Sequence, residues 1–321
     1  MTRYAAVDCG TNSIRLLITE VSDEGFKEVV RENTIVRLGQ GVDATGRLDP
    51  EAIERTRIAL EHYVELMEAN EVETVRMVAT SATRDASNKD EFFAMTRQLL
   101  SRIRPGYQAE VITGDEEALL AFRGAIVDLP KDQGPFCVID LGGGSTEFIV
   151  GTYDGEILGS HSAQMGCVRL TERIMRSDPP TETEVEIARD YVAERIEDVK
   201  KIVPISKAKT FVGCAGTFTT ISAWVQGLEF YDRNAIHLSA LNFDALRVIT
   251  DEIISESSTQ RASNPVVDPG RADVIGGGSV VVQAAIELAS DEAGVDYIII
   301  SEKDILDGLI LGLVEEQATG E

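Results

Sequence analysis

Residues 8–18 read DCGTNSIRLLI, and residues 140–150, a further 132 positions along the chain, read DLGGGSTEFIV. Aligned without a gap, the two stretches share an aspartate, a glycine and a serine, and apolar residues flank both. Two apolar runs joined by a tight loop rich in small polar residues predict a β-hairpin. The offset is a domain length and not a solenoid period. The repeat therefore predicts two domains of one topology, the alternative being two unrelated glycine-rich turns.

Strands and helices alternate along the rest of the chain. Apolar runs at Val75–Ala79, Phe136–Ile139 and Thr210–Val212 predict strands. A turn and a helical pattern follow the first and the third, whereas a second strand at Phe148–Gly151 follows the glycine loop after Phe136–Ile139. Thr34–Leu38 predicts the third strand of the first domain. The polar stretch Ser255–Asp273, with two prolines, predicts a surface loop. This alternation predicts an α/β architecture.

The length and composition exclude several classes of protein. The 321 residues suit two domains, and 43% hydrophobic with 26% charged residues is an ordinary globular balance. The formal net charge of −25 disfavours a general nucleic-acid or anionic-membrane binder, because its field repels phosphate. A local basic groove stays possible, since salt screens charges beyond about 8 Å.

The sequence also indicates a cytoplasmic protein. No apolar run approaches the roughly 20 residues of a membrane-spanning helix, and the start, MTRYAAVDCG, does not resemble a signal peptide. The four cysteines form no CxxC pair, and the three histidines have no ligand spacing. We expect reduced thiols and no zinc site.

The two hairpin loops have the chemistry of a phosphate and metal site. Glycines let successive backbone N–H groups converge on an anion. The hydroxyls of Thr11, Ser13, Ser145 and Thr146 add donors. An aspartate at the end of each strand suits Mg²⁺, which takes one or two carboxylates together with phosphate oxygens and water. Neither loop fits the GxxxxGK[ST] or GxGxxG pattern, so a P-loop enzyme and a dinucleotide site are disfavoured.

The motifs, taken in order, resemble those of a known family. DCGTNSIRLL, ATSATRDASN, GDEEALLAF, VIDLGGGSTEF, MGCVRLTER and GCAGT resemble the exopolyphosphatase / guanosine pentaphosphate phosphatase family of the actin/hexokinase/Hsp70 superfamily, over residues 3–313. The chain is most similar to short, two-domain actinobacterial members. The resemblance implies two actin-like (ribonuclease H-like) α/β domains with an interdomain cleft. We expect them at 1–123, joined by a closing helix at 301–321, and at 124–300.

The resemblance also implies roles for individual acids. Glu117 matches the general base that activates the attacking water. The alternative is that Asp115, Glu116 and Glu117 are acids of the first helical turn, where the helix dipole favours negative charge. Glu116 is the neighbour most easily confused with the base. Asp140 and Glu147 match the positions that hold a divalent metal. Asp8 would add a water-mediated contact. For Asp140, Glu147 and Asp8 the alternative is a solvated carboxylate in a turn.

Other residues are expected to contact phosphate. Arg84 has the guanidinium fork that suits bidentate oxygen binding. Arg15, which aligns with Glu147, could instead pair with a carboxylate. The phosphate-loop donors implied by the resemblance are Asn12, Ser13, Gly142, Gly143, Gly144 and Ser145. Arg169, Arg271 and Lys303 could line a channel for a long chain, the alternative being solvated surface groups. The glycines at 213, 216 and 276–278 match positions where superfamily relatives cradle a nucleoside, but we interpret them as packing residues.

These residues predict a phosphoanhydride hydrolase. The expected reaction removes the terminal phosphate of inorganic polyphosphate with Mg²⁺ or another divalent cation such as Mn²⁺. The alternative is guanosine pentaphosphate 5′-phosphohydrolysis, with guanosine penta- or tetraphosphate as ligand. An acceptor-dependent kinase and a non-catalytic nucleotide sensor are further alternatives. We expect a homodimer, which would extend a channel for a long polyanion, and no nucleic-acid or membrane partner.

Overall fold

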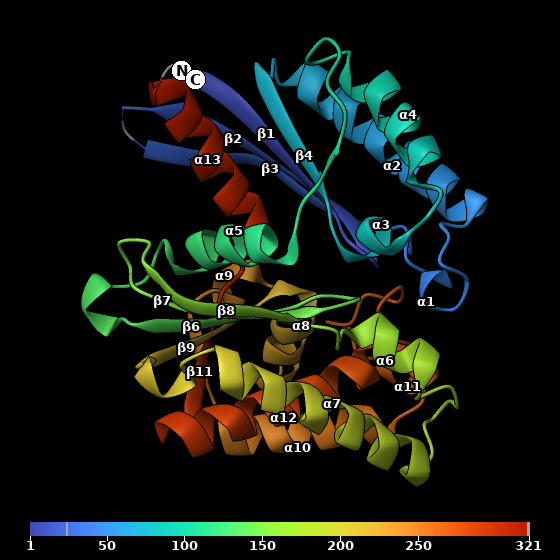
Figure 1. Cartoon of the computed structure of the whole chain (residues 1–321), viewed down its shortest axis with the longest axis vertical. Helices are drawn as coiled ribbons and strands as arrows, with labels where there is room; N and C mark the ends of the chain where they lie inside the picture. Colours follow the sequence, from blue (N-terminus) through green and yellow to red (C-terminus); the bar gives the residue numbers. More distant parts are fainter. Residues whose placement is uncertain (24, 320–321) are drawn as a thin grey trace. The chain divides into compact units, whose positions relative to one another are not determined.

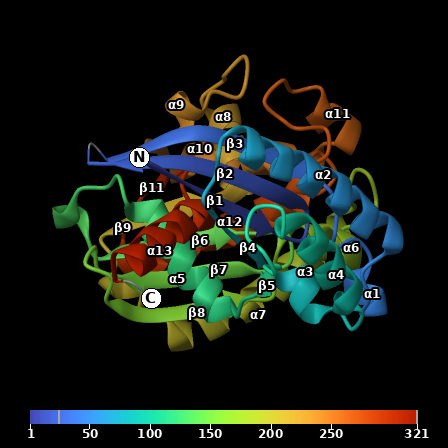
Figure 2. The same ribbon diagram turned by 90° about the horizontal axis from the view of Figure 1, so that it is seen from above.

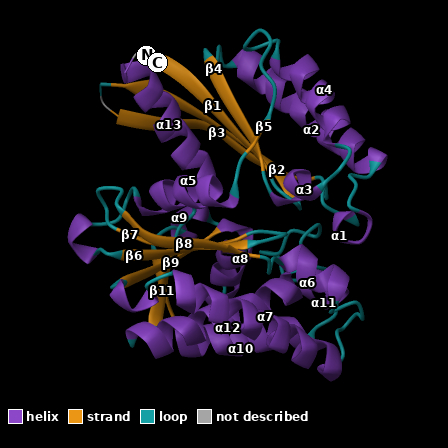
Figure 3. Ribbon diagram, in the orientation of Figure 1, coloured by secondary structure: helices purple, strands orange, loops and turns teal. Residues whose placement is uncertain are grey.

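The chain folds into two compact α/β units in a computed structural model that describes residues 1–23 and 25–319 (Figures 1 and 3). Unit 1 comprises Met1–Leu120 and Ile305–Glu321, and unit 2 comprises Ala121–Asp304. The chain passes from unit 1 to unit 2 within helix α5 (Gly114–Ile126) and returns just before helix α13 (Ile305–Thr319). The predicted α/β class is confirmed, since each unit has one mixed sheet with helices packed on it.

Unit 1 is built on a five-stranded sheet with the order β3-β2-β1-β4-β5. The β1/β2 and β2/β3 pairs are antiparallel, while β4 and β5 continue the sheet in parallel. Figure 2 shows the first three strands side by side. The strands are β1 (Thr2–Cys9), β2 (Ser13–Ser22), β3 (Gly25–Ile35), β4 (Thr74–Ala79) and β5 (Glu110–Val111). The predicted bounds of the third strand, Thr34–Leu38, were wrong, because β3 spans Gly25–Ile35. It is an edge strand with many polar residues, so it shows no apolar run before Thr34.

Unit 2 repeats this arrangement. Its sheet has the order β10-β11-β9-β6-β7-β8, so β8-β7-β6-β9-β11 corresponds to β3-β2-β1-β4-β5. The directions also agree, with two antiparallel pairs followed by two parallel ones, and β10 is an additional antiparallel edge. The strands are β6 (Phe136–Leu141), β7 (Thr146–Gly151), β8 (Ile157–Ala163), β9 (Thr210–Cys214), β10 (Ser239–Asn242) and β11 (Tyr297–Ile300).

The two hairpins match in detail. Each loop is closed by the same backbone hydrogen bond, from Gly10 N to Ser13 O at 2.9 Å and from Gly142 N to Ser145 O at 3.0 Å. The register matches as well: Asp8 lies opposite Arg15 on the neighbouring strand, as residue 140 lies opposite residue 147. The alternative of two unrelated turns is therefore wrong.

Helices cover the sheet of unit 1. Helix α2 (Pro50–Ala69) begins where Asp49 accepts a hydrogen bond from Glu51 N and Pro50 fills the first helical position. Helix α13 packs against β1 and β2, and Arg31 of β3 donates to both oxygens of Asp307 at 2.9 Å. The remaining helices of this unit are α1 (Val42–Thr45), α3 (Ser81–Asp85) and α4 (Lys89–Leu100).

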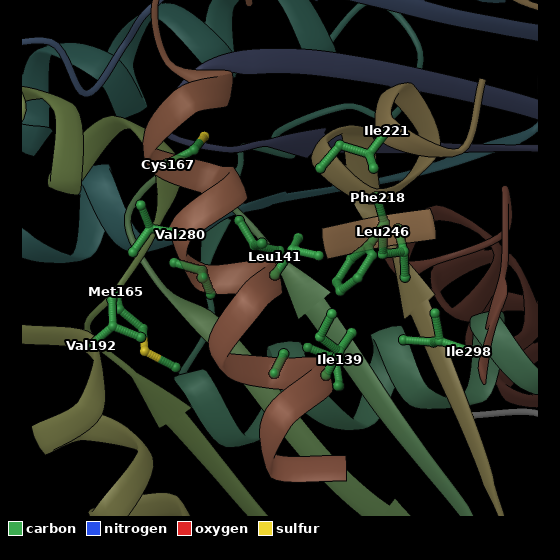
Figure 4. Packing of buried hydrophobic residues seen from close by; sticks show 14 of the residues in the cluster. Ile139, Leu141, Met165, Cys167, Val192, Phe218, Ile221, Leu246, Val280 and Ile298 are labelled. Carbon is green, nitrogen blue, oxygen red and sulfur yellow. The ribbon is translucent and has the colours of Figure 1, made fainter. Parts of the chain in front are cut away.

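The core of unit 2 surrounds β6 and β7, which are buried along their whole length. Figure 4 shows Ile139 and Leu141 of β6 among Val280, Phe218 and other apolar side chains. The helices are α6 (Cys167–Arg173), α7 (Glu182–Ile202), α8 (Ala215–Val225), α9 (Arg233–Ile236), α10 (Phe243–Ser255), α11 (Ser258–Ala262) and α12 (Ile275–Ala293).

The glycines at the start of α12 are packing residues, as interpreted from the sequence. A Cβ on Gly277 would lie 2.8 Å from the carbonyl oxygen of Cys167, and a Cβ on Gly278 would lie 2.7 Å from Thr217 Cγ2. Both distances are too short for a side chain. The glycines therefore let α12 approach α6 and α8 closely.

The predicted surface loop at 255–273 was wrong in its middle. Helix α11 forms there, and Arg261 within it is 3% exposed. Its guanidinium donates to the carbonyls of Ile253 and Glu256 at 2.7 Å and of Ala272 at 3.1 Å. Two of these carbonyls end α10, so the arginine caps that helix with a favourable charge.

Arg261→Met should lower the free energy of unfolding by about 3 kcal/mol, because several buried carbonyls would lose their donor at 1–3 kcal/mol each. Arg247→Met is the matched control, since Arg247 of α10 makes only an exposed ion pair with Asp244, worth well under about 1 kcal/mol. Urea unfolding of both variants measures the difference. Equal effects for the two arginines would contradict the capping role.

The four cysteines are free and buried, as expected for reduced thiols. Burial raises the pKa of the Cys9 and Cys137 thiols, which keeps them protonated and unreactive. Among the helices that the structure describes, none has both the length and the apolar character of a membrane span.

Candidate active site

The loop of the first hairpin is held by its carbonyl groups. The carbonyl of Asn12 accepts hydrogen bonds from the amides of Val36 and Arg37 at 3.0 and 2.8 Å. The carbonyl of Thr11 accepts from the amide of Gly39 at 2.8 Å. Gly39 permits this approach, because a Cβ there would lie 2.2 Å from Thr11 Cγ2. The segment after β3 thus fixes the loop from one side.

The loop of the second hairpin is held in the same way by the segment after β8. Donors at the start of α6 bind all three glycine carbonyls. The contacts are Cys167 N to Gly142 O (3.1 Å), Val168 N and Arg169 N to Gly143 O (2.9 and 3.1 Å), and Arg169 Nε to Gly144 O (2.7 Å). Arg169, expected in a substrate channel, therefore has a clear part in holding the loop.

This anchoring turns the loop amides the other way. In a trans peptide the C=O and the following N–H point in opposite directions. Carbonyls bound to α6 therefore direct the N–H groups of Gly143, Gly144 and Ser145 away from that helix, and these amides have no acceptor within residues 1–23 and 25–319. In the first loop the carbonyl of Thr11 is bound to Gly39, so the N–H of Asn12 in the same peptide group points away from Gly39. Converging amides of this kind suit an anion.

The hydroxyl groups of the second loop are used differently from the sequence expectation. Ser145 Oγ donates to Glu147, and Thr146 Oγ1 donates to the carbonyl of Met165. A hydroxyl has a single proton. As the structure stands, these two groups do not donate to phosphate, and the backbone amides are the donors that the loop offers.

Glu117 is the only buried acid of the first turn of α5. Asp115 is exposed, and Glu116 is half exposed and bonded to Arg76 at 2.8 Å. Glu117 is 9% exposed and lies 3.2 Å from the Nη1 nitrogen of Arg84. The helix dipole would favour all three acids equally, so burial beside an arginine distinguishes Glu117 from its neighbours.

Arg84 keeps one edge of its guanidinium available. Its Nη1 nitrogen donates to the carbonyl of Ile112 at 2.8 Å and to Glu117. Its Nε and Nη2 nitrogens donate to no group in the described part of the chain. Parallel N–H groups of this kind form the fork that binds two oxygens of a carboxylate or phosphate.

Two carboxylates lie side by side in unit 2. Asp140 on β6 and Glu147 on β7 are directly opposite in register and are 7% and 1% exposed. Like charges in this position destabilise a sheet, and a divalent cation would offset the repulsion. The equivalent pair in unit 1 differs, because Arg15 Nη2 lies 2.6 Å from Asp8 Oδ2. The interpretation of Arg15 as a carboxylate partner is confirmed.

The residues of unit 2 fit a hard divalent cation. Within the described residues, no group of three or more His, Cys, Asp or Glu side chains forms a metal centre held by protein alone. Mg²⁺ does not require one, since it usually takes one or two carboxylates, substrate phosphates and water. Asp140 and Glu147, next to outward-facing amides, meet that description. Asp8 fits less well because Arg15 binds one of its oxygens.

The other basic residues suggested by the sequence contact different groups. Lys303 Nζ pairs with Asp128 at 2.7 Å. The guanidinium of Arg271 lies against Gly216, where a Cβ would be 1.8 Å from Nη1. Two residues that sequence reasoning missed do contact the site: Ser162 donates to Glu147 at 2.7 Å, and Gly166 packs directly on the glycine loop.

Comparison with known proteins decides the family. The profile of the Ppx/GppA phosphatase family matches residues 17–317. The chain belongs to this family. Ppx/GppA proteins of known structure share its fold. A crystal structure of an exopolyphosphatase-like protein, 37% identical, superposes with a TM-score of 0.91 over 98% of this chain and 100% of the other. The Aquifex aeolicus Ppx/GppA family member, 31% identical, superposes with a TM-score of 0.79 over 98% of both chains.

A curated relative is more similar in sequence. Exopolyphosphatase 2 of Mycobacterium tuberculosis is 53% identical over 317 residues, which cover 98% of this chain and 99% of the relative. The similarity therefore extends over both units. The actin-like two-domain fold implied by the sequence motifs is confirmed by these matches to Ppx/GppA structures.

Proposed function

We propose that this chain is an exopolyphosphatase that uses a divalent cation to hydrolyse the terminal phosphoanhydride bond of inorganic polyphosphate. The observation that carries the proposal is the full-length, 53% identity to exopolyphosphatase 2. The site supports it independently. Outward-facing loop amides, an arginine with a free edge and a buried carboxylate pair are the groups that a phosphoanhydride requires.

The residues divide the chemistry among them. The amides of Gly143, Gly144 and Ser145, with those of Asn12 and Ser13, bind phosphate oxygens. The free edge of Arg84 binds the terminal phosphate. When bound to Asp140 and Glu147, a cation such as Mg²⁺ neutralises charge on the phosphate oxygens. Asp8 contributes through water.

Glu117 accepts the proton of the attacking water. Terminal phosphoryl transfer to water needs a positioned proton acceptor and charge neutralisation more than a covalent nucleophile. The 3.2 Å contact with Arg84 holds the carboxylate close to the arginine that would bind the phosphate. This contact supports the assignment of Glu117 as the base, because its partner is the arginine proposed to bind the terminal phosphate.

Removal of divalent metal should abolish phosphate release. Purified protein treated with EDTA should release orthophosphate from polyphosphate at less than about 1% of its rate with Mg²⁺, since metal stabilisation of a transferring phosphoryl group is worth several kcal/mol. Added Mg²⁺ or Mn²⁺ should restore the rate. An undiminished rate in EDTA would contradict the metal role of Asp140 and Glu147.

The substrate is tested by comparing short and long polyphosphate with guanosine pentaphosphate under the same conditions. We expect orthophosphate release from polyphosphate without any added acceptor. Faster hydrolysis of guanosine pentaphosphate would favour the nucleotide phosphohydrolase. Phosphate transfer only in the presence of an acceptor would indicate a kinase, and binding without turnover would indicate a sensor.

A further inference from the structure

The buried carboxylate of Glu147 is contacted from a third strand. Ser162 on β8 lies directly opposite Glu147 on β7, just as Asp140 on β6 does on the other side. Residues opposite one another on neighbouring strands share a face of the sheet. The three residues therefore form one row, in which Glu147 has a second carboxylate on one side and a hydroxyl on the other.

Two hydroxyl groups bind the same oxygen of this carboxylate. Ser145 Oγ and Ser162 Oγ each donate to Oε1 of Glu147 at 2.7 Å. A carboxylate oxygen has two lone pairs, so the two hydroxyls use both on Oε1. Glu147 is 1% exposed, so water does not compete effectively with these charge-assisted bonds. They orient the carboxylate without adding a positive charge.

We propose that Ser162 is a positioning residue for divalent-cation binding by Glu147, an inference that rests on the proposed function. Its hydroxyl, together with that of Ser145, holds the carboxylate in one orientation, in which Glu147 would take the cation alongside Asp140. Partners of metal-ligating side chains fix ligand orientation, and their removal typically weakens metal binding 10- to 100-fold.

A purely structural role makes a different prediction. If Ser162 only satisfied a buried carboxylate, its loss would change the stability of the fold but not the metal affinity of the folded protein. Ser162→Thr retains the hydroxyl and suits a strand. Ser160→Ala is the matched control, because Ser160 lies two residues earlier on the same face of β8 and its hydroxyl contacts no group within the described residues.

The experiment titrates Mn²⁺ into the metal-free, full-length protein and follows free Mn²⁺ by electron paramagnetic resonance, with and without orthophosphate. We expect Ser162→Ala to raise the Kd for Mn²⁺ about tenfold. Ser162→Thr and Ser160→Ala should stay within about twofold of wild type. Glu147→Gln should weaken binding more than Ser162→Ala does. Circular dichroism at the assay temperature verifies that each variant is folded.

The outcomes separate this inference from the function it rests on. Wild-type affinity in Ser162→Ala, with binding lost in Glu147→Gln, would overturn the role of Ser162 and leave the metal site standing. Wild-type affinity in Glu147→Gln, or no Mn²⁺ binding by the wild type in either condition, would overturn the metal site and the role of Ser162 together.

Discussion

Glu117→Gln should lower kcat for polyphosphate hydrolysis by about 10³-fold while the Kd for polyphosphate stays within about threefold of wild type, because a general base contributes 10²–10⁴ to the rate. The amide keeps the shape of the side chain but cannot accept a proton from water. Phosphate-release kinetics measure kcat, and equilibrium binding of polyphosphate to the variant measures the Kd.

Glu116→Gln provides the control for this prediction. Glu116 precedes the base by one residue but is half exposed and bonded to Arg76. We expect its kcat within about threefold of wild type. If both variants lost activity equally, the first turn of α5 would matter for its charge and not for one base. Near-normal kcat in Glu117→Gln would remove the general-base assignment.

The hairpin repeat carried most of what the sequence could predict. Aspartate, glycine and serine recur at the same positions because each has a role within the hairpin itself. The glycine amide closes the loop by donating to the serine carbonyl, and the aspartate lies near the end of a strand. Roles that depend only on neighbouring residues can be recognised from the local sequence. The repeat thus predicted both loops and the common topology of the units, and the structure bears out their correspondence down to one hydrogen bond.

Ser162 could not be predicted as a site residue because its contact depends on how two strands pair. Ser162 reaches Glu147 only because β8 pairs with β7 at that position. The stretch ILGSHSA carries no strong strand pattern, being half exposed over most of its length. One signal was present: the third strand beside the first hairpin implied a third strand beside the second. Extending the repeat past residue 150 would have directed attention to β8.

The burial of Arg261 in α11 could not be predicted from the polar sequence, because it too depends on contacts with other parts of the chain. Surface loops and short capped helices have similar composition, and Arg261 is accommodated only because three backbone carbonyls, two at the end of α10 and one at Ala272, converge on it. No local pattern predicts such convergence. Burial of a charge that depends on distant partners has to come from the structure.

The comparison of the two hairpins also explains why we propose the metal site in unit 2. The same row of the sheet holds Asp8, Arg15 and Asn33 in unit 1. In unit 2 it holds two acids and a serine. An arginine beside the aspartate reduces its attraction for a cation, whereas a second carboxylate increases it. One duplicated framework thus supports two different charge arrangements.

Gly166→Ala should lower kcat/KM by about 100-fold, since misplacing catalytic groups by about 1 Å can cost that much. A Cβ on Gly166 would lie 2.3 Å from the carbonyl carbon and oxygen of Gly143 and 2.5 Å from the amide of Gly144. These are backbone atoms, which cannot rotate away as a flexible side chain can. The glycine loop at 142–144 itself would have to move.

The backbone conformation of Gly166 makes the effect purely steric. Its φ of −112° and ψ of 164° are accessible to alanine, so the substitution introduces no conformational strain of its own. Gly312→Ala in α13 is the control, because a Cβ there meets nothing within 4 Å. Steady-state kinetics with polyphosphate, at a temperature where circular dichroism shows both variants folded, compares the two. Full activity in Gly166→Ala would mean that the glycine loop tolerates displacement, and its amides would then be poor candidates for aligning the substrate.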